Sequence, residues 1–329
     1  METGGRVAVI FGGHGFIGSH LARELVTSGK YARVVSADIA PQPRFRSKGV
    51  EYTFCDVRSP IPADLAPGVT EIYNLAAVHV TPGPEDWEYY WTNVSGALNV
   101  TQYARVAKAK TLFFTSSISV YGPSEDEISE FSDPNPESSY GKSKLLAEGI
   151  HQSWQLEEPR HRKLVIVRPA VVFGFQERGN FTRLARSLER RAFFYPGRRD
   201  TKKACGYVKD LVASLEFAHR SEEMLTIYNF AFDEPVTTEG ICAAFCRVAN
   251  LPEPKFTIPI SLILLGGLAF ELLSKLGLKT PINRARVLKL FRSTNIVPKK
   301  LQNDGFVRQF DLVAALRDWR SQSPVGRFE

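Results

Sequence analysis

Residues 6–21 read RVAVIFGGHGFIGSHL, and this stretch decides the fold. The apolar run Arg6–Phe11 predicts a buried strand, and apolar residues at helical spacing after the run predict a helix. Gly12, Gly15 and Gly18 form a GxxGxxG fingerprint at the junction of these two elements. Glycine permits a tight turn and the close approach of a pyrophosphate, which the free N–H groups and dipole of a helix N-terminus stabilise. The stretch therefore predicts the first βα unit of a dinucleotide-binding fold.

Short apolar segments alternate with helical patterns through the first half of the chain. The predicted strands after Arg6–Phe11 are Arg33–Asp38, Glu51–Cys55, Ile72–Leu75, Leu112–Ser116 and Leu164–Arg168. Uninterrupted apolar strands between helices are typical of a parallel sheet that is buried on both faces. The sequence therefore predicts the α/β class, with a Rossmann doubly wound parallel sheet.

The character of the sequence changes after Pro169, where basic helical sequence leads into a turn and a polar loop. We expect residues 1–170 to form the cofactor-binding domain, with residues 206–230 returning to it. Residues 171–205 and 231–329 are expected to form a smaller C-terminal α/β lobe that binds the substrate. The returning part is predicted to contain the helix Val208–Arg220 and the strand Thr226–Phe230.

The formal net charge is +7, and much of the positive charge is concentrated in one segment. The basic residues of this segment are Arg183, Arg186, Arg190, Arg191, Arg198, Arg199, Lys202 and Lys203. Some of them are expected to coat a solvated helix face, and the others suit a phosphate group. The sequence contains no recognisable nucleic-acid-binding module. We therefore expect a small anionic substrate and no nucleic-acid partner.

Other classes of protein are disfavoured by what the sequence lacks. The four scattered cysteines form no CxxC pair and no histidine cluster has metal-ligand spacing, so we expect neither a disulfide nor a metal site. The N-terminus does not resemble a secretory signal, which favours the cytoplasm. The apolar stretch Ile258–Phe270 is too short to span a bilayer. We expect it to form a core helix or a cap over the site, with peripheral membrane contact as the alternative.

The end of the second predicted strand indicates which dinucleotide binds. Asp38 ends that strand, where a carboxylate accepts hydrogen bonds from the adenosine ribose and repels a 2′-phosphate. This favours NAD over NADP, although Arg44 and Arg46 on the following loop act against the preference. Asp56 and Val57 follow the third strand and are placed to meet the adenine. The alternative for Asp56 is an ordinary exposed carboxylate at a strand end.

A second group of residues suggests proton transfer. Tyr140 and Lys144 stand four residues apart, so they lie one above the other on a helix face. Ser117 follows the strand Leu112–Ser116 at the carboxyl edge of the sheet, where ligands of such folds bind. An ammonium group near a phenol lowers the pKa of the tyrosine, which makes Tyr140 a candidate general base and acid. Ser117 is expected to hold the substrate oxygen by a hydrogen bond.

These features together resemble the extended short-chain dehydrogenases/reductases. Within that family they are similar to the NAD-dependent nucleotide-sugar epimerase/dehydratase group, and in particular to its UDP-glucose 4-epimerase type. The resemblance covers most of the chain and is carried by Gly12–Leu21, Asn74–Ala77, Asn93–Gly96, Ser116–Gly122 and Tyr140–Lys144, with Arg168-Pro169 and Tyr207–Asp210 as later landmarks. It implies that Ser117, Tyr140 and Lys144 form a catalytic triad. With the spacing arguments, it gives an expected cofactor-binding set of Gly12, Gly15, Phe16, Ile17, Gly18, Asp38, Asp56, Val57, Leu75, Ala76, Ala77, Asn93, Tyr140 and Lys144.

The chain departs from the pattern of this group at several positions. Dehydratases of the group carry an acidic pair where this chain has Ile118 and Ser119, so sugar dehydration is disfavoured. Many epimerases have asparagine where this chain has Val171, so the phosphate contacts must be partly rearranged. Candidate substrate-binding residues, besides Ser117, are Asn180, Arg183, Arg199 and Lys203.

Three functions follow from these observations. The leading hypothesis is NAD-dependent 4-epimerisation of a UDP-hexose through a 4-keto intermediate. The second is a net redox enzyme, either a 4-keto nucleotide-sugar reductase or a 3β-hydroxysteroid-type dehydrogenase, because Arg168–Gly174 and the apolar stretch Ile258–Phe270 also resemble the steroid-dehydrogenase branch. The third is a catalytically silent NAD-sensing protein. The resemblance also implies a homodimer formed through a four-helix bundle.

Overall fold

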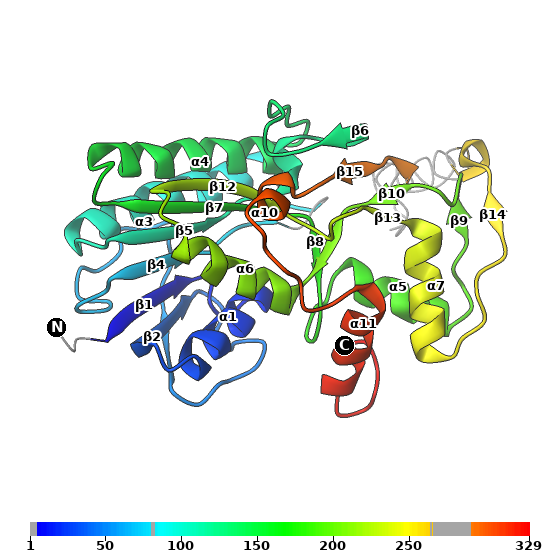
Figure 1. Ribbon diagram of the computed structural model, residues 1–329, viewed down its shortest axis with the longest axis horizontal. Coiled ribbons are helices and arrows are strands. Elements are labelled where there is room, and N and C mark those ends of the chain that lie inside the picture. Colours follow the sequence, from blue (N-terminus) through cyan, green and yellow to red (C-terminus); the bar gives the residue numbers. More distant parts are fainter. Residues whose placement is uncertain (1–4, 80–82, 264, 266–290) are drawn as a thin grey trace, which may run out of the picture.

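The core of the structure is a seven-stranded parallel sheet with the strand order β12-β7-β5-β4-β1-β2-β3 (Figure 1). It belongs to a computed structural model that describes residues 5–79, 83–263, 265 and 291–329. The strands are β1 Arg6–Phe11, β2 Tyr31–Asp38, β3 Val50–Phe54, β4 Glu71–Asn74, β5 Thr111–Thr115, β7 Lys163–Pro169 and β12 Leu225–Phe230. The predicted α/β class with a Rossmann doubly wound sheet is confirmed.

Helices cover both faces of this sheet. One face packs on α1 and α6, and the other packs on α3 and α4. The helices and helical turns of these layers are α1 Phe16–Thr27, α2 Asp86–Tyr90, the π-helix η1 Trp91–Ser95, α3 Gly96–Val106, the 3-10 turn η2 Ile118–Val120, α4 Ser139–Glu157 and α6 Val208–Arg220. The helix predicted at Val208–Arg220 is α6, and β12 follows it into the edge of the sheet.

Strand β1 shows why the strands are uninterrupted apolar runs. Ala8 and Ile10 pack in the core beneath α1 and α6, whereas Val9 and Phe11 pack in the core beneath α3 and α4. Successive side chains of a strand point to opposite faces, so a strand covered on both faces has no solvent-facing position. All four side chains are fully buried.

Most of the smaller elements gather beyond the carboxyl ends of the main strands, whereas α10 Lys299–Asn303 packs against β12 (Figure 1). Three small sheets have the orders β13-β10-β15-β6, β11-β8 and β14-β9. These elements are β6 Ser124–Ile128, β8 Val171–Phe173, α5 Asn180–Glu189, β9 Tyr195–Pro196, β10 Lys202–Lys203, β11 Cys205–Tyr207, β13 Val236–Thr237, α7 Thr238–Ala249, β14 Thr257–Ile258, β15 Thr294–Ile296, α10 Lys299–Asn303 and α11 Leu312–Gln322. Strand β6 pairs with β15, although it precedes residue 170.

Aromatic residues form the core of this part of the chain. Phe173 of β8, Phe245 of α7 and Trp319 of α11 are fully buried in one cluster. The chain therefore has a further hydrophobic core besides the two on the faces of the main sheet. Residues 264 and 266–270 of the predicted apolar element Ile258–Phe270 lie outside the described residues, and in its described part Leu262 and Leu265 are exposed.

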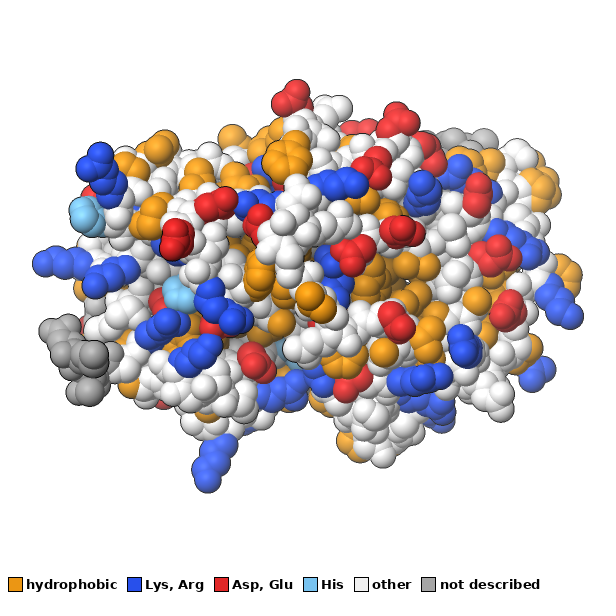
Figure 2. Space-filling model, viewed as in Figure 1, with side chains coloured by type: hydrophobic (Ala, Val, Ile, Leu, Met, Phe, Trp, Pro, Cys, Tyr) orange, Lys and Arg blue, Asp and Glu red, His pale blue; other side chains and the backbone are white. Residues whose placement is uncertain are grey.

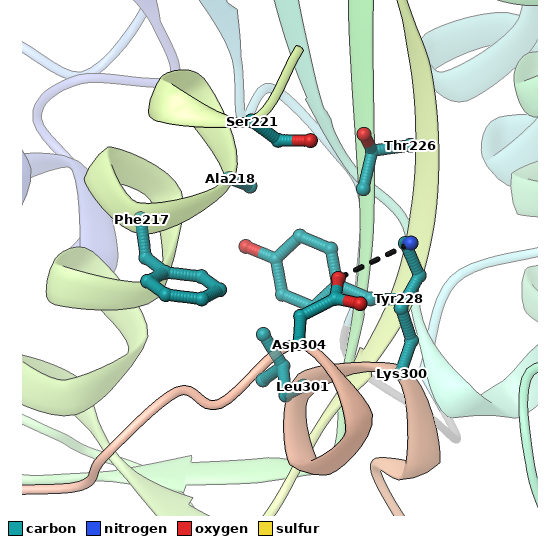
Figure 3. A pocket seen from close by; sticks show the side chains of 8 residues that line it. All are labelled: Phe217, Ala218, Ser221, Thr226, Tyr228, Lys300, Leu301 and Asp304. Carbon is teal, nitrogen blue, oxygen red and sulfur yellow. Dashed lines mark ion pairs between the residues drawn. The ribbon is translucent and has the colours of Figure 1, made fainter. Parts of the chain in front are cut away.

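A small cavity lies between α6, β12 and α10 (Figure 3). Its wall includes Phe217, Thr226 and Tyr228, and the Lys300–Asp304 ion pair of 3.2 Å closes one side. The α6 residues that line it lie in the C-terminal part of that helix, and the β12 residues lie in the first half of that strand. Ligands of such sheets bind at the carboxyl ends of the strands, so this cavity is a packing gap away from the candidate site.

Candidate active site

The glycine turn between β1 and α1 leaves no room for side chains. Gly12 has a φ of +74°, and a Cβ atom there would lie 2.6 Å from the backbone nitrogen of Ala76. A Cβ atom on Gly18 would lie 2.5 Å from the carbonyl oxygen of Gly12. Both positions therefore require glycine. No side chain among the described residues caps α1, so its first N–H groups are available to an anion.

Asp38 braces this turn from the neighbouring strand. Its two carboxylate oxygens accept hydrogen bonds from the backbone N–H groups of His14 (3.0 Å) and Ala40 (2.9 Å). The His14 ring is buried, with its Nδ1 atom 2.6 Å from the carbonyl oxygen of Ala40. The sequence analysis missed His14, although its position inside the glycine turn is a signal. Each Asp38 oxygen retains a second lone pair, so the carboxylate is able to accept ribose hydroxyls as well.

The residues present fit a nicotinamide dinucleotide. Glycines that tolerate no Cβ atom, an uncapped helix N-terminus at Phe16 and Ile17, and a carboxylate at the carboxyl end of β2 lie along one edge of the sheet. This set matches the needs of a pyrophosphate and an adenosine ribose. Leu75 and Ala76 close the other side of the turn, because the Leu75 N–H group donates to the carbonyl oxygen of Phe11 at 2.9 Å.

The remaining predicted cofactor residues also make contacts within the protein. Both carboxylate oxygens of Asp56 are held by the guanidinium of Arg58, with a shortest distance of 2.7 Å, and this pair lowers the pKa of Asp56. Val57 is buried beneath Gly96. Asn93 donates to the Ser143 hydroxyl at 2.8 Å, and its amide also bonds to both backbone groups of Val78, which follows Ala77.

Ser117 and Tyr140 meet at the carboxyl end of β5. Ser138 caps α4 by accepting the Gly141 N–H group at 3.1 Å, which sets Tyr140 in the first turn of that helix. Burial raises the pKa of Tyr140 to about 12, and a hydrogen bond to the Ser117 side chain acts in the opposite direction. The structure therefore brings together two of the three predicted catalytic side chains.

Lys144 lies one helical turn further along α4 and is 2% exposed. Its ammonium nitrogen lies 4.5 Å from the centroid of the Phe114 ring, a cation–π distance. Burial lowers the pKa of Lys144 to about 7, opposed by the charge of Glu148. The sequence argument expects Lys144 to lower the pKa of Tyr140, whereas in this structure burial dominates and that pKa is raised.

Behind these side chains lies a buried ionic network that the sequence analysis missed. Glu148 of α4 accepts two hydrogen bonds from the Arg168 guanidinium of β7, at 2.9 and 2.7 Å, and one from the Ser116 hydroxyl at 2.5 Å. Arg168 also donates to the Tyr121 hydroxyl at 2.6 Å, which donates to Asn229 at 2.9 Å. Ser116, Tyr121 and Arg168 lie in motifs that carry the family resemblance, but no sequence pattern predicts that they form a network with Glu148.

The predicted substrate-binding residues lie in separate places. Asn180 and Arg183 begin α5 and bond to each other at 2.7 Å. Arg199 contacts Thr257, Glu239 and the carbonyl oxygen of Lys255. Lys203 donates to the carbonyl oxygen of Arg292 at 2.6 Å.

The parts of the chain that the structure describes contain no cluster of three or more His, Cys, Asp or Glu side chains arranged to hold a metal ion. Within the same parts, no helix has both the length and the apolar character needed to cross a membrane.

The sheet topology and the glycine turn define the class as a Rossmann-type dinucleotide-binding protein. Residues 8–231 match the NAD dependent epimerase/dehydratase family, and the chain belongs to that family. Its cofactor is accordingly NAD.

Three relatives illustrate the similarity. The chain is 28% identical, over 94% of its length and 92% of the relative, to the N-acetyl-alpha-D-glucosaminyl-diphospho-ditrans,octacis-undecaprenol 4-epimerase of Escherichia coli O157:H7. It is 32% identical to a UDP-glucose 4-epimerase of Lactobacillus helveticus over 43% of this chain and 45% of that protein. The structure of UDP-glucuronic acid 4-epimerase from Bacillus cereus with NAD superimposes with a TM-score of 0.74 at 19% identity, covering 95% of this chain and 96% of that one.

Proposed function

We propose that the protein is an NAD-dependent 4-epimerase of a diphosphate-linked sugar, with a UDP-hexose as the leading substrate. The observation that carries the proposal is that Ser117 and Tyr140 lie close enough for the Ser117 side chain to affect the pKa of Tyr140, at the sheet edge that holds the glycine turn. The chain's membership of the epimerase/dehydratase family and its 4-epimerase relatives support it. The net redox and NAD-sensing alternatives have no comparable support.

The roles of the three side chains follow from their chemistry. Tyr140 takes the proton of the C4 hydroxyl and later returns it, while Ser117 holds the C4 oxygen by a hydrogen bond. NAD, when bound, supplies the hydride acceptor and donor for C4. A phenol whose pKa is raised by burial stays protonated at neutral pH, so it cannot act as a base until that pKa is lowered. We assign Lys144 the task of lowering that pKa in the complex, because an ammonium group nearby stabilises the phenolate.

The predicted binding sets belong to this proposal. The cofactor-binding residues are those that line the sheet edge from Gly12 to Lys144, as identified from the sequence. Asn180, Arg183, Arg199 and Lys203 are retained as candidate contacts for the diphosphate. In the proposed division, residues 1–170 and 206–230 bind NAD, and residues 171–205 and 231–329 bind the sugar.

The four cysteines are free and buried, which supports the proposed cytoplasmic setting.

The proposal is tested with the purified protein and a panel of UDP-hexose pairs. We expect one pair to reach the same equilibrium mixture from either side, without net formation of NADH. Steady accumulation of NADH would instead identify a net redox enzyme. A chain that equilibrates no pair in the panel would contradict the UDP-hexose substrate.

A second candidate substrate is a sugar linked through diphosphate to a polyprenol. The observation in its favour is the Escherichia coli relative, whose match extends over nearly the whole of both chains, whereas the Lactobacillus helveticus match covers less than half of each. The same assay distinguishes the candidates when an undecaprenyl-diphosphate N-acetylhexosamine is added to the panel. Equilibration of the lipid-linked pair alone would transfer the proposal to this substrate.

We also propose a homodimer formed by α3 and α4. These helices pack side by side, and the Arg105–Glu157 ion pair joins them. Their outer faces nevertheless expose large apolar side chains, namely Leu98, Val106, Leu146 and Leu156, each more than half exposed. Such side chains on neighbouring helices are typical of a surface that a second copy covers.

A further inference from the structure

The ribbon formed by β9 and β14 exposes large apolar side chains at one end of the molecule. Phe194 precedes β9 and Phe256 precedes β14, and their side chains are 40% and 77% exposed. The parallel register pairs Tyr195 with Thr257, and the Tyr195 N–H group donates to the Phe256 carbonyl oxygen at 2.9 Å. The two phenylalanines are therefore neighbours. Leu262, 59% exposed, follows a few residues after β14.

Basic side chains surround these apolar ones. Arg190 and Arg191 lie just before Phe194, and Lys255 lies just before Phe256; all three are exposed. None of the three forms an ion pair with another residue of the described chain. Arg199 is held against this ribbon by the carbonyl oxygen of Lys255 at 2.6 Å. Two exposed carboxylates, Glu189 and Glu253, lie in the same segments, so the cations are in excess.

Figure 2 shows blue basic and orange apolar side chains side by side at the right-hand end, over β9 and β14 of Figure 1. Arg199 is retained above as a candidate diphosphate contact, and the catalytic proposal uses none of the exposed side chains Arg190, Arg191, Phe194, Lys255, Phe256 and Leu262. A patch of exposed aromatic and aliphatic groups flanked by unpaired cations has the two components of interfacial membrane binding. Its apolar groups enter the acyl boundary, and its cations contact anionic headgroups.

We propose that the patch formed by Arg190, Arg191, Phe194, Lys255, Phe256 and Leu262 docks the protein on an anionic lipid bilayer. The contact is peripheral, because the patch consists of side chains on a short ribbon and its flanking segments. Docking does not depend on which sugar the enzyme accepts. It would bring the active site to the surface where a polyprenol-linked substrate, the second candidate of the proposed function, resides.

Another exposed aromatic residue shows why the charge matters. Phe131 is 73% exposed but stands between Glu130 and Asp133. Neighbouring carboxylates repel an anionic headgroup, so exposure alone does not predict membrane binding at Phe131. Phe131 is therefore a matched control for the loss of one exposed phenyl ring.

The test is co-sedimentation of the full chain with vesicles of phosphatidylcholine, alone or mixed with phosphatidylglycerol. We expect binding to the anionic vesicles to exceed binding to the neutral ones by about tenfold or more and to weaken as salt is added. The double substitution Phe194→Ser and Phe256→Ser is expected to weaken binding by about tenfold or more, since two phenyl rings that would enter the bilayer are lost. Arg190→Glu with Arg191→Glu is expected to weaken it similarly, and Phe131→Ser is expected to bind as the unmodified protein does.

Several outcomes would overturn the proposal. They are the absence of vesicle binding, equal binding by the Phe194/Phe256 variant, and self-association through the patch in place of vesicle binding. Epimerisation of a water-soluble UDP-hexose is expected to be the same in all these variants. A loss of vesicle binding with that activity intact would therefore be distinguished from failure of the proposed function.

Discussion

At Tyr140, burial and a neighbouring hydroxyl act in opposite directions on the same pKa. Burial raises it to about 12, and the hydrogen bond to Ser117 lowers it. The neutral phenol is therefore the resting form at neutral pH. Proton transfer at the sugar would depend on a single oxygen atom, which the substitution of tyrosine by phenylalanine removes with little change in shape.

We predict that Tyr140→Phe lowers kcat by about 10²- to 10⁴-fold, the usual contribution of a positioned acid or base. The free energy of unfolding should change little. Tyr31→Phe is the matched control, because it removes another partly buried phenol oxygen, bonded to Glu71 at 2.7 Å near the opposite end of the sheet. Equal activity losses in the two variants, measured by steady-state kinetics, would contradict the role assigned to Tyr140.

Lys144 leads to a prediction about stability and pH. Its pKa is lowered by burial to about 7, whereas an unfolded chain has a lysine pKa of about 10.4. Between these values the unfolded chain binds more protons, so stability rises with pH through this window and is flat below it. We predict that, from pH 7 to pH 9, the unfolding free energy of the unmodified protein rises relative to that of Lys144→Met, by up to about 1.4 kcal/mol per pH unit. Parallel stability curves from urea denaturation would rule this out.

Among the elements, α4 depends on its buried ionic network for its position on the sheet. Glu148 joins the helix to Ser116, the residue after β5, and to Arg168 of β7, so the turn that carries Tyr140 and Lys144 is held against both strands. Removal of one partner would leave the other charge buried without compensation. Such losses are costly even where the intact pair adds little net stability.

We predict that Glu148→Ala lowers the free energy of unfolding by about 3–5 kcal/mol. Glu157→Ala on the same helix is the control, because Glu157 is partly exposed and pairs with Arg105 and Arg162 near the surface. That change should cost about 0–1 kcal/mol for each surface pair. Comparable losses for the two variants in chemical denaturation would show that the network does not hold α4 in place.

Local sequence patterns predicted some elements of this fold but not others. The predicted run Arg6–Phe11 is β1, and the predicted helix Val208–Arg220 is α6, because continuous apolar character and helical periodicity are local properties. The pairing of β6 with β15 was not predicted. Strand β6 is largely polar and β15 is short, so neither has a pattern that separates it from a loop.

For the whole molecule, the exposed face of α3 and α4 leads to the last prediction. We predict that Leu98→Glu combined with Leu146→Glu converts a dimer to a monomer, because two like charges on each copy would face their symmetry mates. Val307→Glu is the control, as Val307 is 82% exposed and lies outside these helices. Light scattering coupled to size exclusion measures the mass of each variant. A monomeric unmodified protein would contradict the proposed dimer.

The sequence by itself determined the parallel sheet, the glycine turn and the pairing of that turn with Asp38, since each depends on neighbouring residues or on strand order. Only the tertiary structure decided which side chains meet. The Tyr121–Asn229 hydrogen bond joins residues 108 positions apart, and the Arg168–Glu148 pair joins a strand to a helix. No local pattern encodes such contacts, because they arise when distant segments are buried against one another. The same burial raised the pKa of Tyr140, where helical spacing alone predicted that Lys144 would lower it.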